Sequence, residues 1–340
     1  MKQSILDKTD SMHGRSGLSE RQKELMKERI DQTLRTIHNK MIDLFHIDFT
    51  YFNDIKIVDK SDILDWLTRK MENDFQTNLV AQEEAEWRRF YRFVLEKQIK
   101  DHFKKLAFYD QERDTLCLSE DVLEDGVQTA ISVSVHELSE KMLSTIFSPI
   151  LRKQSLILKE KFLQIGKVKN FEEIRQLFDE YMRLVSASVF KEGLCEAMSL
   201  CTLRSMKASE TYVNSLEKEL EKQHLKCIDL LFDLERIRED IGETETVAMG
   251  LDAASSAAKV DEVKKLVMTT TLRNSHIIKG ASYCLGYSLA KAFIERYELK
   301  EVEAVLELCP PFKAEHFSNP HMYLQLLKSK NLLPLMTPRS

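Results

Sequence analysis

The chain has 340 residues, a formal net charge of −5, 31% charged residues and 43% hydrophobic residues. These values are ordinary for a folded globular protein and allow either one domain with two subdomains or two domains. The weakly negative charge provides no basic field, so we expect no nucleic-acid partner. Nine glycines and six prolines leave few turn signals, which favours a mostly helical protein.

The N-terminal segment, residues 1–18, is polar and contains Gly14 and Gly17, which predicts a flexible leader. It lacks the apolar core of a secretory signal, and no run of 18 apolar residues occurs, so we expect no membrane span. The six cysteines form no CxxC pair and are too sparse for a disulfide scaffold. Together these features predict a cytoplasmic protein with reduced thiols.

Helical and β-branched segments alternate in the first part of the chain. A helical pattern runs from Ser19, which opens a capping box, to about residue 46. The run 55–58 predicts a strand, and residues 106–118 predict a hairpin or two edge strands. Two further helices are predicted after Ser61-Asp62, over 63–67 and 82–106.

The next helical pattern contains the most informative motif of the chain. Its apolar residues recur at helical spacing and are Val127, Ile131, Val135, Leu138 and Met142. His136 and Glu140 are four residues apart, so they share one helix face, with Glu137 offset from both. Zinc peptidases of the HExxH type use this geometry, in which two helix ligands hold a metal and the Glu activates its water.

Beyond Pro149 the pattern is almost wholly helical. Residues 250–258 are rich in small side chains and predict either a loop or a closely packed helix start. The predicted helical segments are 151–163, 171–185, 190–197, 203–240, 261–270 and 276–297, followed by a proline-containing tail. We therefore predict an α+β fold that is mostly α, divided into the leader 1–18, an α+β subdomain 19–150 and a helical subdomain 151–340.

Three separated segments, spanning about residues 55–325 with their flanks, look like a family of bacterial and archaeal zincin-like metallopeptidases of the gluzincin type. They are residues 108–116 with 135–138, residues 192–197 (EGLCEA), and Lys279-Gly280 with residues 309–323 (CPPFKAEHFSNPHMY). The last segment is similar to a C-terminal signature PP-x-[ST]-x-E-Q-x-x-HP-x-x-Y. The matching residues are Pro310, Pro311, Glu315, Pro320 and Tyr323, and the departures are Lys313, His316 and Asn319.

The resemblance implies a zincin-like fold with a small mixed N-terminal sheet and a helical C-terminal subdomain. It implies that His136 is the first metal ligand, Glu137 the general base and Glu192 the third ligand, with Glu196 as a supporting residue. Glu140 stands where the family has its second His. The expected cofactor is a divalent metal, Zn²⁺ first, with Mn²⁺ or Fe²⁺ more competitive because the site carries two carboxylates.

The expected function is that of a metallopeptidase-related protein with an altered His-Glu-Glu site, acting on a peptide or protein, in which hydrolysis is weak or lost. A strand before the motif helix offers a free edge for an extended peptide, although a plain strand-to-helix connection explains it too. The alternative function is a non-catalytic helical interaction protein on a zincin scaffold. The lost His favours that alternative, whereas the retained His136, Glu137 and Glu192 favour metal chemistry.

Each candidate residue also has an ordinary structural explanation. His136 fits a partly buried histidine bonded to a carboxylate, and Glu137 fits a helix charge paired with Lys141. Tyr283 and Tyr287 have the helical spacing of core aromatics, which we favour over an oxyanion-stabilising role. Nucleotide-binding loops and the GxSxG motif are absent, so we expect no organic cofactor and no serine nucleophile.

Overall fold

The computed structural model describes residues 18–59, 62, 107–163, 168–208, 210–300, 302–311 and 313–339. The predicted leader and the helices predicted at 63–67 and 82–106 lie outside these residues. Two compact units are formed, one from the described parts of Met1–Thr145 and Met198–Glu217, the other from those of Ile146–Ala197 and Lys218–Ser340. Helices α5 (Val127–Leu163) and α6 (Phe171–Ser205) are continuous through these boundaries.

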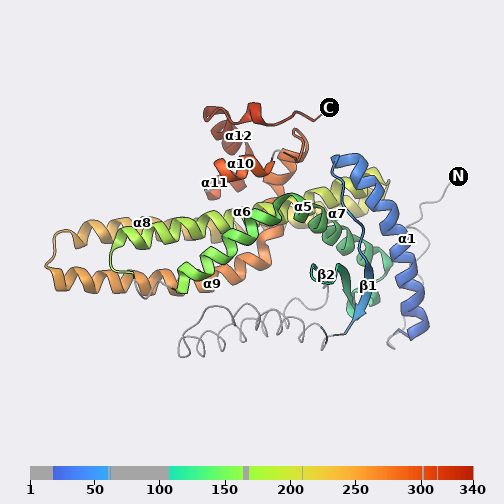
Figure 1. Ribbon diagram of the computed structural model, residues 1–340, viewed down its shortest axis with the longest axis horizontal. Helices are drawn as coiled ribbons and strands as arrows, with labels where there is room; N and C mark the ends of the chain where they lie inside the picture. Colours follow the sequence, from blue (N-terminus) through green and yellow to red (C-terminus); the bar gives the residue numbers. More distant parts are fainter. Residues whose placement is uncertain are drawn as a thin grey trace. The chain divides into compact units, whose positions relative to one another are not determined.

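The first unit contains a three-stranded mixed sheet in the order β1-β3-β2 (Figure 1). Strand β1 (Asp54–Val58) is parallel to β3 (Thr115–Ser119), and β2 (Ala107–Asp110) is antiparallel to β3. Every residue of β3 is buried, as its central place requires. The predicted fold class is confirmed at this level, because the described chain is mostly helical with one small mixed sheet.

Helix α1 (Glu20–Phe45) packs beside β1 in the same unit. Its buried residues recur at helical spacing and are Ile30, Leu34, Ile37, Met41 and Phe45. The predicted capping box is present, since Ser19 Oγ accepts from the Gln22 N–H and the Gln22 side chain accepts from the Ser19 N–H. The helix ends at His46, which adopts a left-handed conformation with φ 55°.

Three predicted helix breaks were wrong. Helix α5 continues through Pro149 to Leu163, because one proline removes only one helical hydrogen bond and long flanks can sustain the helix. The segments predicted at 171–185 and 190–197 are one helix, α6. Likewise, those predicted at 261–270 and 276–297 belong to α9 (Ala253–Ile294), which starts at an Asp252 N-cap.

The predicted continuous segment 203–240 was also wrong. Helix α6 ends at Ser205, where Lys207 turns the chain with φ 56°. Helix α7 (Glu210–Cys227) and helix α8 (Asp229–Ala248) follow, with Ile228 between them. The leucines of this segment recur at helical spacing, and this regular spacing did not reveal the interruption at Ile228.

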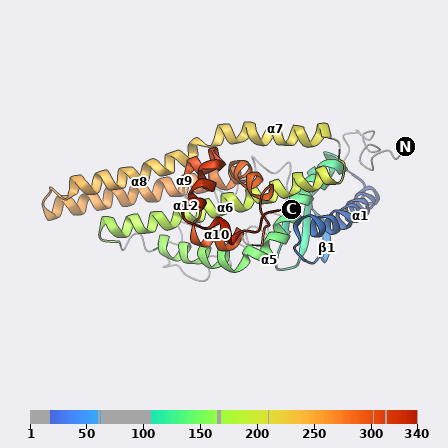
Figure 2. The same cartoon turned by 90° about the horizontal axis from the view of Figure 1, so that it is seen from above.

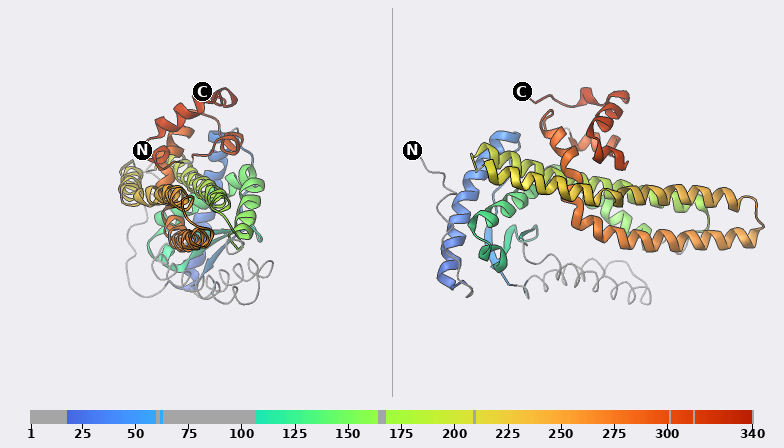
Figure 3. Two further views of the ribbon diagram at one scale, coloured as in Figure 1. Left: turned by 90° about the vertical axis from the view of Figure 1, so that its left-hand side faces the viewer. Right: turned by 180° about the vertical axis from the view of Figure 1, so that it is seen from behind.

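In the second unit, α8 and α9 lie side by side and are joined by the turn 249–252 (Figures 2 and 3). The C-terminal helices α10 (Val302–Leu308), α11 (Ala314–Ser318) and α12 (Pro320–Ser329) and the 3₁₀ turn Leu333–Leu335 complete the unit. Helix α11 contacts both α8 and α9. Phe293 anchors this core, with ring centroids 5.3 Å from Phe190 and 5.7 Å from Tyr323.

Helices α6 and α9 approach each other at two glycines of the second unit. A Cβ atom built on Gly193 would lie 2.2 Å from the carbonyl carbon of Gly286, and one on Gly286 would lie 1.9 Å from the oxygen of Val189. No side chain larger than hydrogen fits at either position without moving a helix. None of the helices in the described part of the chain has the length and apolar character that crossing a membrane requires.

Candidate metal site

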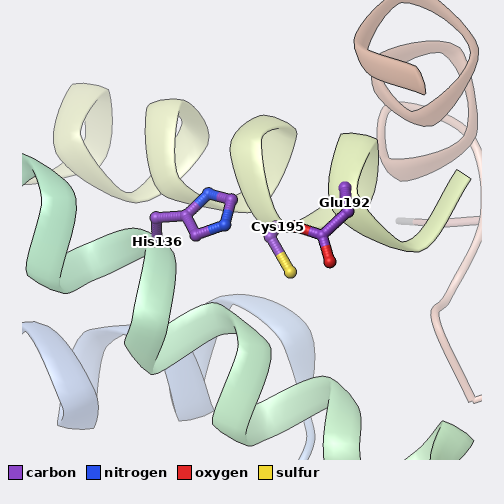
Figure 4. A group of neighbouring side chains, drawn as sticks. All are labelled: His136, Glu192 and Cys195. Carbon is purple, nitrogen blue, oxygen red and sulfur yellow. The ribbon is translucent and has the colours of Figure 1, made fainter. Parts of the chain in front are cut away.

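Three potential metal ligands lie together on α5 and α6. His136 of α5, Glu192 of α6 and Cys195 of α6 each offer a ligand atom, and these atoms all lie within 4.8 Å of one another. Figure 4 shows the imidazole projecting from α5 toward the carboxylate and the sulfur, which leave α6 on the same side. Among the described residues, this is the group of His, Cys, Asp and Glu side chains that could hold a metal ion.

Local helix geometry explains why these residues meet. Glu192 and Cys195 are three residues apart on α6, so their side chains leave the same face. One turn further along α6, Ser199 Oγ lies 3.2 Å from Ser139 Oγ of α5, and Ser139 also donates to Val135 O at 2.8 Å. This buried contact sets the register of α6 against α5 near His136.

The three candidate ligands differ in their access to solvent. Cys195 is completely buried, whereas His136 and Glu192 are half-buried, although Nδ1 of His136 is itself a buried atom. Solvent thus reaches the group from the side of His136 and Glu192 and not from the side of Cys195. Catalytic zinc sites in proteins likewise have three protein ligands, with water in the fourth position.

The distances fit a single small metal ion. Zinc binds nitrogen and oxygen at about 2.0 Å and sulfur at about 2.3 Å, so neighbouring tetrahedral ligands lie roughly 3.3–3.6 Å apart. The candidate ligand atoms all lie within 4.8 Å of one another, an upper bound roughly 1 Å above that spacing. An imidazole, a carboxylate and a thiolate are also the three ligand types that zinc uses in proteins.

Glu137 is placed against the sheet. It is 8% exposed, and its Oε2 accepts a hydrogen bond from the backbone N–H of Tyr109 at 2.9 Å. Because β2 is an edge strand, this carboxylate takes one of the outward-facing N–H groups that an added peptide strand would need. The structure therefore gives Glu137 a bond to the edge strand in addition to its position next to His136.

Glu140 is outside the His136–Glu192–Cys195 group. Its charge acts instead on Tyr109, whose pKa is raised by burial first, then by the hydrogen bond to Asp114 and by the charges of Asp110 and Glu140. Of the three ligands predicted from the sequence, the structure thus brings together His136 and Glu192 and adds Cys195. The EGLCEA segment could have indicated Cys195 as a candidate ligand, because Cys195 follows Glu192 by about one helical turn.

A buried lysine stabilises the side of α5 next to the motif. Lys141 is 4% exposed, forms an ion pair with Asp114, and donates to the carbonyl of Tyr51 at 2.8 Å. Its Nζ also lies 5.4 Å and 5.5 Å from the ring centroids of Phe52 and Tyr109. These contacts hold the β2–β3 turn against α5.

The remaining residues singled out in the sequence are outside the group. Tyr287 is 2% exposed and belongs to the core, whereas Tyr283 of the same helix is exposed. His316 is buried, and its Nδ1 accepts from the backbone N–H of Lys313 at 3.2 Å, while His321 is exposed. This contact gives His316 a structural role at the start of α11.

Comparisons of the chain with family models, with curated proteins and with solved structures found no match. The His136–Glu192–Cys195 group is therefore the feature of the chain that bears on its function.

Proposed function

We propose that this protein binds one divalent transition-metal ion through His136, Glu192 and Cys195. The observation that carries the proposal is the convergence of their ligand atoms within 4.8 Å, on two helices whose register is set by the Ser139–Ser199 contact. The arrangement is specific, because Glu192 lies 56 residues beyond His136 in the chain. Zincin-like architecture, in which a helix motif and a distant Glu share one metal, is part of the same proposal.

The donor set selects zinc over harder ions. A thiolate is a soft ligand, and replacing a second carboxylate by Cys195 lowers the preference for Mn²⁺ that a His-Glu-Glu site would have. One imidazole, one carboxylate and one thiolate also neutralise the charge of a divalent ion. We therefore propose Zn²⁺ as the resident metal, with Fe²⁺ as the alternative.

We propose further that the protein is metallopeptidase-related and that its peptide hydrolysis is weak or lost. A bound Zn²⁺ would supply a Lewis acid and a more acidic bound water. The base expected beside it is Glu137, but its Oε2 is held by the Tyr109 N–H. Hydrolysis would require Glu137 to leave β2, and an arriving peptide strand would have to compete for the same N–H.

Metal analysis tests the proposal. The natural chain, purified without chelator and supplied with equimolar Zn²⁺, is expected to retain about one metal ion per chain by mass spectrometry. Loss of a residue that only hydrogen-bonds to a metal ligand weakens metal affinity roughly 10–100-fold. His136→Ala and Cys195→Ala each remove a ligand, so we expect each to weaken zinc affinity by more than that. A natural chain that retains no zinc in this assay contradicts the proposal.

Two matched controls separate ligand loss from damage to α6. Cys201→Ala removes a half-buried cysteine, and Glu180→Ala a half-buried glutamate, from the same helix as Cys195 and Glu192. Both are expected to keep full zinc binding. If Cys201→Ala loses zinc as strongly as Cys195→Ala, the effect belongs to the helix and not to the ligand.

A non-catalytic interaction protein is the second candidate, and one observation favours it. Three apolar side chains are exposed at or next to the turn between α8 and α9: Val247 at 59%, Met249 at 78% and Leu251 at 43%. Exposed apolar clusters of this kind mark binding surfaces. Zinc-loaded protein that cleaves nothing in a mixed peptide library, together with concentration-dependent association that is lost in Met249→Lys, favours this candidate.

A further inference from the structure

Two cysteines of the second unit face each other, away from the candidate metal site. Cys227 is the last residue of α7, and Cys284 lies in α9. The Cys227 thiol is the nearest ionisable influence on Cys284, through its charge and a hydrogen-bonding interaction, so the two side chains are neighbours. The Cys284 thiol itself donates to the carbonyl oxygen of Ala281 at 3.0 Å. A disulfide requires Cβ atoms about 3.5–4.5 Å apart, so two neighbouring cysteines on packed helices are the pair in this unit to consider.

A second contact fixes the end of α7 against α9. Nδ1 of His224 lies 3.3 Å from the carbonyl oxygen of Cys284. His224 precedes Cys227 by three residues, so both leave the same face of α7. His224 is only 8% exposed, which shows that this face is packed. The C-terminal end of α7 and the Cys284 turn of α9 therefore belong to one packed contact.

We propose that Cys227 and Cys284 are a thiol–disulfide pair, an oxidation site that links α7 to α9 when a hydroperoxide is present. None of the six cysteines, all of which lie in the described part of the chain, forms a disulfide in the structure. This inference is independent of the proposed metal site, because neither cysteine belongs to it.

Exposure and acidity set the order of the two steps. Cys227 is half-buried and accessible to a small oxidant, whereas Cys284 is 1% exposed. Burial, with a contribution from the neighbouring Cys227 thiol, raises the pKa of Cys284 to about 12, so Cys284 is a protonated thiol at neutral pH. Because Cys284 is both buried and protonated, the accessible Cys227 is the residue that reacts first with the oxidant.

The reaction balances with hydrogen peroxide as the oxidant. The Cys227 sulfur attacks one peroxide oxygen, the O–O bond breaks, and a sulfenic acid and one water are formed. The Cys284 sulfur then attacks the Cys227 sulfur, the S–S bond forms, and the S–O bond breaks. The released hydroxide takes the Cys284 proton and leaves as a second water. Two thiols are oxidised and one peroxide is reduced to two waters.

Peptide mapping of the full chain tests the proposal. Trypsin cuts after Lys226, Arg236, Lys279 and Lys291, which places Cys227 in the peptide CIDLLFDLER and Cys284 in the peptide GASYCLGYSLAK. Each peptide contains a single cysteine. After treatment with hydrogen peroxide and blocking of remaining thiols, we expect the two peptides to appear as one disulfide-linked species that separates on reduction.

Two variants complete the test. Cys227→Ser is expected to abolish the linked species and to leave Cys284 modifiable as a thiol after unfolding. Cys201→Ser, which removes the half-buried cysteine of α6, is expected to leave it unchanged. The proposal is overturned if the oxidised natural chain contains Cys227 as a sulfinic acid while Cys284 remains a thiol. It is equally overturned if Cys227 links only to other chains or to other cysteines.

Discussion

The carboxylate of Glu137 is bonded to the edge strand of the sheet, where its Oε2 accepts the N–H of Tyr109 at 2.9 Å. The bond connects residues 28 positions apart and joins α5 to β2. It gives Glu137 a structural role whatever the chemistry at its neighbour His136.

Glu137→Ala is therefore expected to lower the free energy of unfolding by about 1–3 kcal/mol, because it leaves the Tyr109 N–H without its acceptor. Glu137→Gln keeps an acceptor oxygen and is expected to cost less. Urea unfolding measures both, and hydrogen exchange at the Tyr109 amide should accelerate in the alanine variant. Equal stability of Glu137→Ala and the natural chain would show that the bond contributes nothing.

Because α6 and α9 approach closely at Gly193 and Gly286, even the methyl group of an alanine at either position is expected to destabilise the protein. Gly193→Ala and Gly286→Ala place a Cβ atom 2.2 Å and 1.9 Å from backbone atoms, so the helices must separate. Each is expected to destabilise the protein by roughly 1–3 kcal/mol or more, the range for overpacking a core. Thermal unfolding is the measurement.

Gly242→Ala is the matched control for these glycines. Gly242 lies inside α8, and a Cβ atom there would meet nothing within 4 Å. Because alanine favours a helix interior over glycine, the control is expected to gain about 0.5–1 kcal/mol. The packing explanation would be wrong if all three substitutions shifted the unfolding midpoint in the same direction.

Removing the lysine of the buried Lys141–Asp114 ion pair is expected to lower the free energy of unfolding strongly. Lys141→Met leaves Asp114 without its lysine and the Tyr51 carbonyl without a donor, and we expect a cost of roughly 3 kcal/mol. Lys222→Met breaks an exposed pair with Glu219 and is expected to change stability by less than about 1 kcal/mol. Urea unfolding of both variants compares the two environments.

His316 predicts a pH dependence of stability. Burial first, and then the charge of Lys313, lower its pKa to about 4, while Glu315 opposes the shift. Since the folded-state pKa lies below the usual value of about 6.5, the unfolded chain takes up the proton first as the pH falls. The stability contributed by neutral His316 is full above about pH 6.5 and is lost between about pH 6.5 and pH 4.

The size of this effect is at most roughly 3 kcal/mol. His316→Asn is expected to reduce the slope of stability against pH in that window, and His321→Asn, which changes an exposed histidine, is expected to leave it unaltered. His224, whose pKa is also lowered by burial, contributes a slope of the same sign in both variants. Identical slopes for His316→Asn and the natural chain would contradict the assignment.

Local signals were sufficient to predict the sheet and the first helix. The run at 55–58 and the capping box at Ser19 are short-range patterns, and the structure has β1 and α1 there. Helix continuity was harder to predict. Pro149 marks a break in the sequence, yet α5 passes through it, because the flanking helix sustains the backbone on both sides.

The candidate site was only partly predictable for a different reason. His136 and Glu192 came from the motif and from the resemblance, but Cys195 depends on how α6 lies against α5. That register is set by a contact between Ser139 and Ser199, 60 residues apart, which no local pattern encodes. Glu140 has the spacing of a second ligand on α5. That spacing alone does not show whether α5 or α6 supplies the ligand.

X-ray absorption at the zinc edge tests the donor set most directly. Zinc held by His136, Glu192 and Cys195 should show nitrogen and oxygen neighbours at about 2.0 Å and one sulfur at about 2.3 Å. The sulfur should disappear in Cys195→Ser and persist in Cys201→Ser. A zinc-loaded natural chain whose spectrum contains no sulfur neighbour would contradict the His-Glu-Cys site and favour a His136, Glu140 and Glu192 site instead.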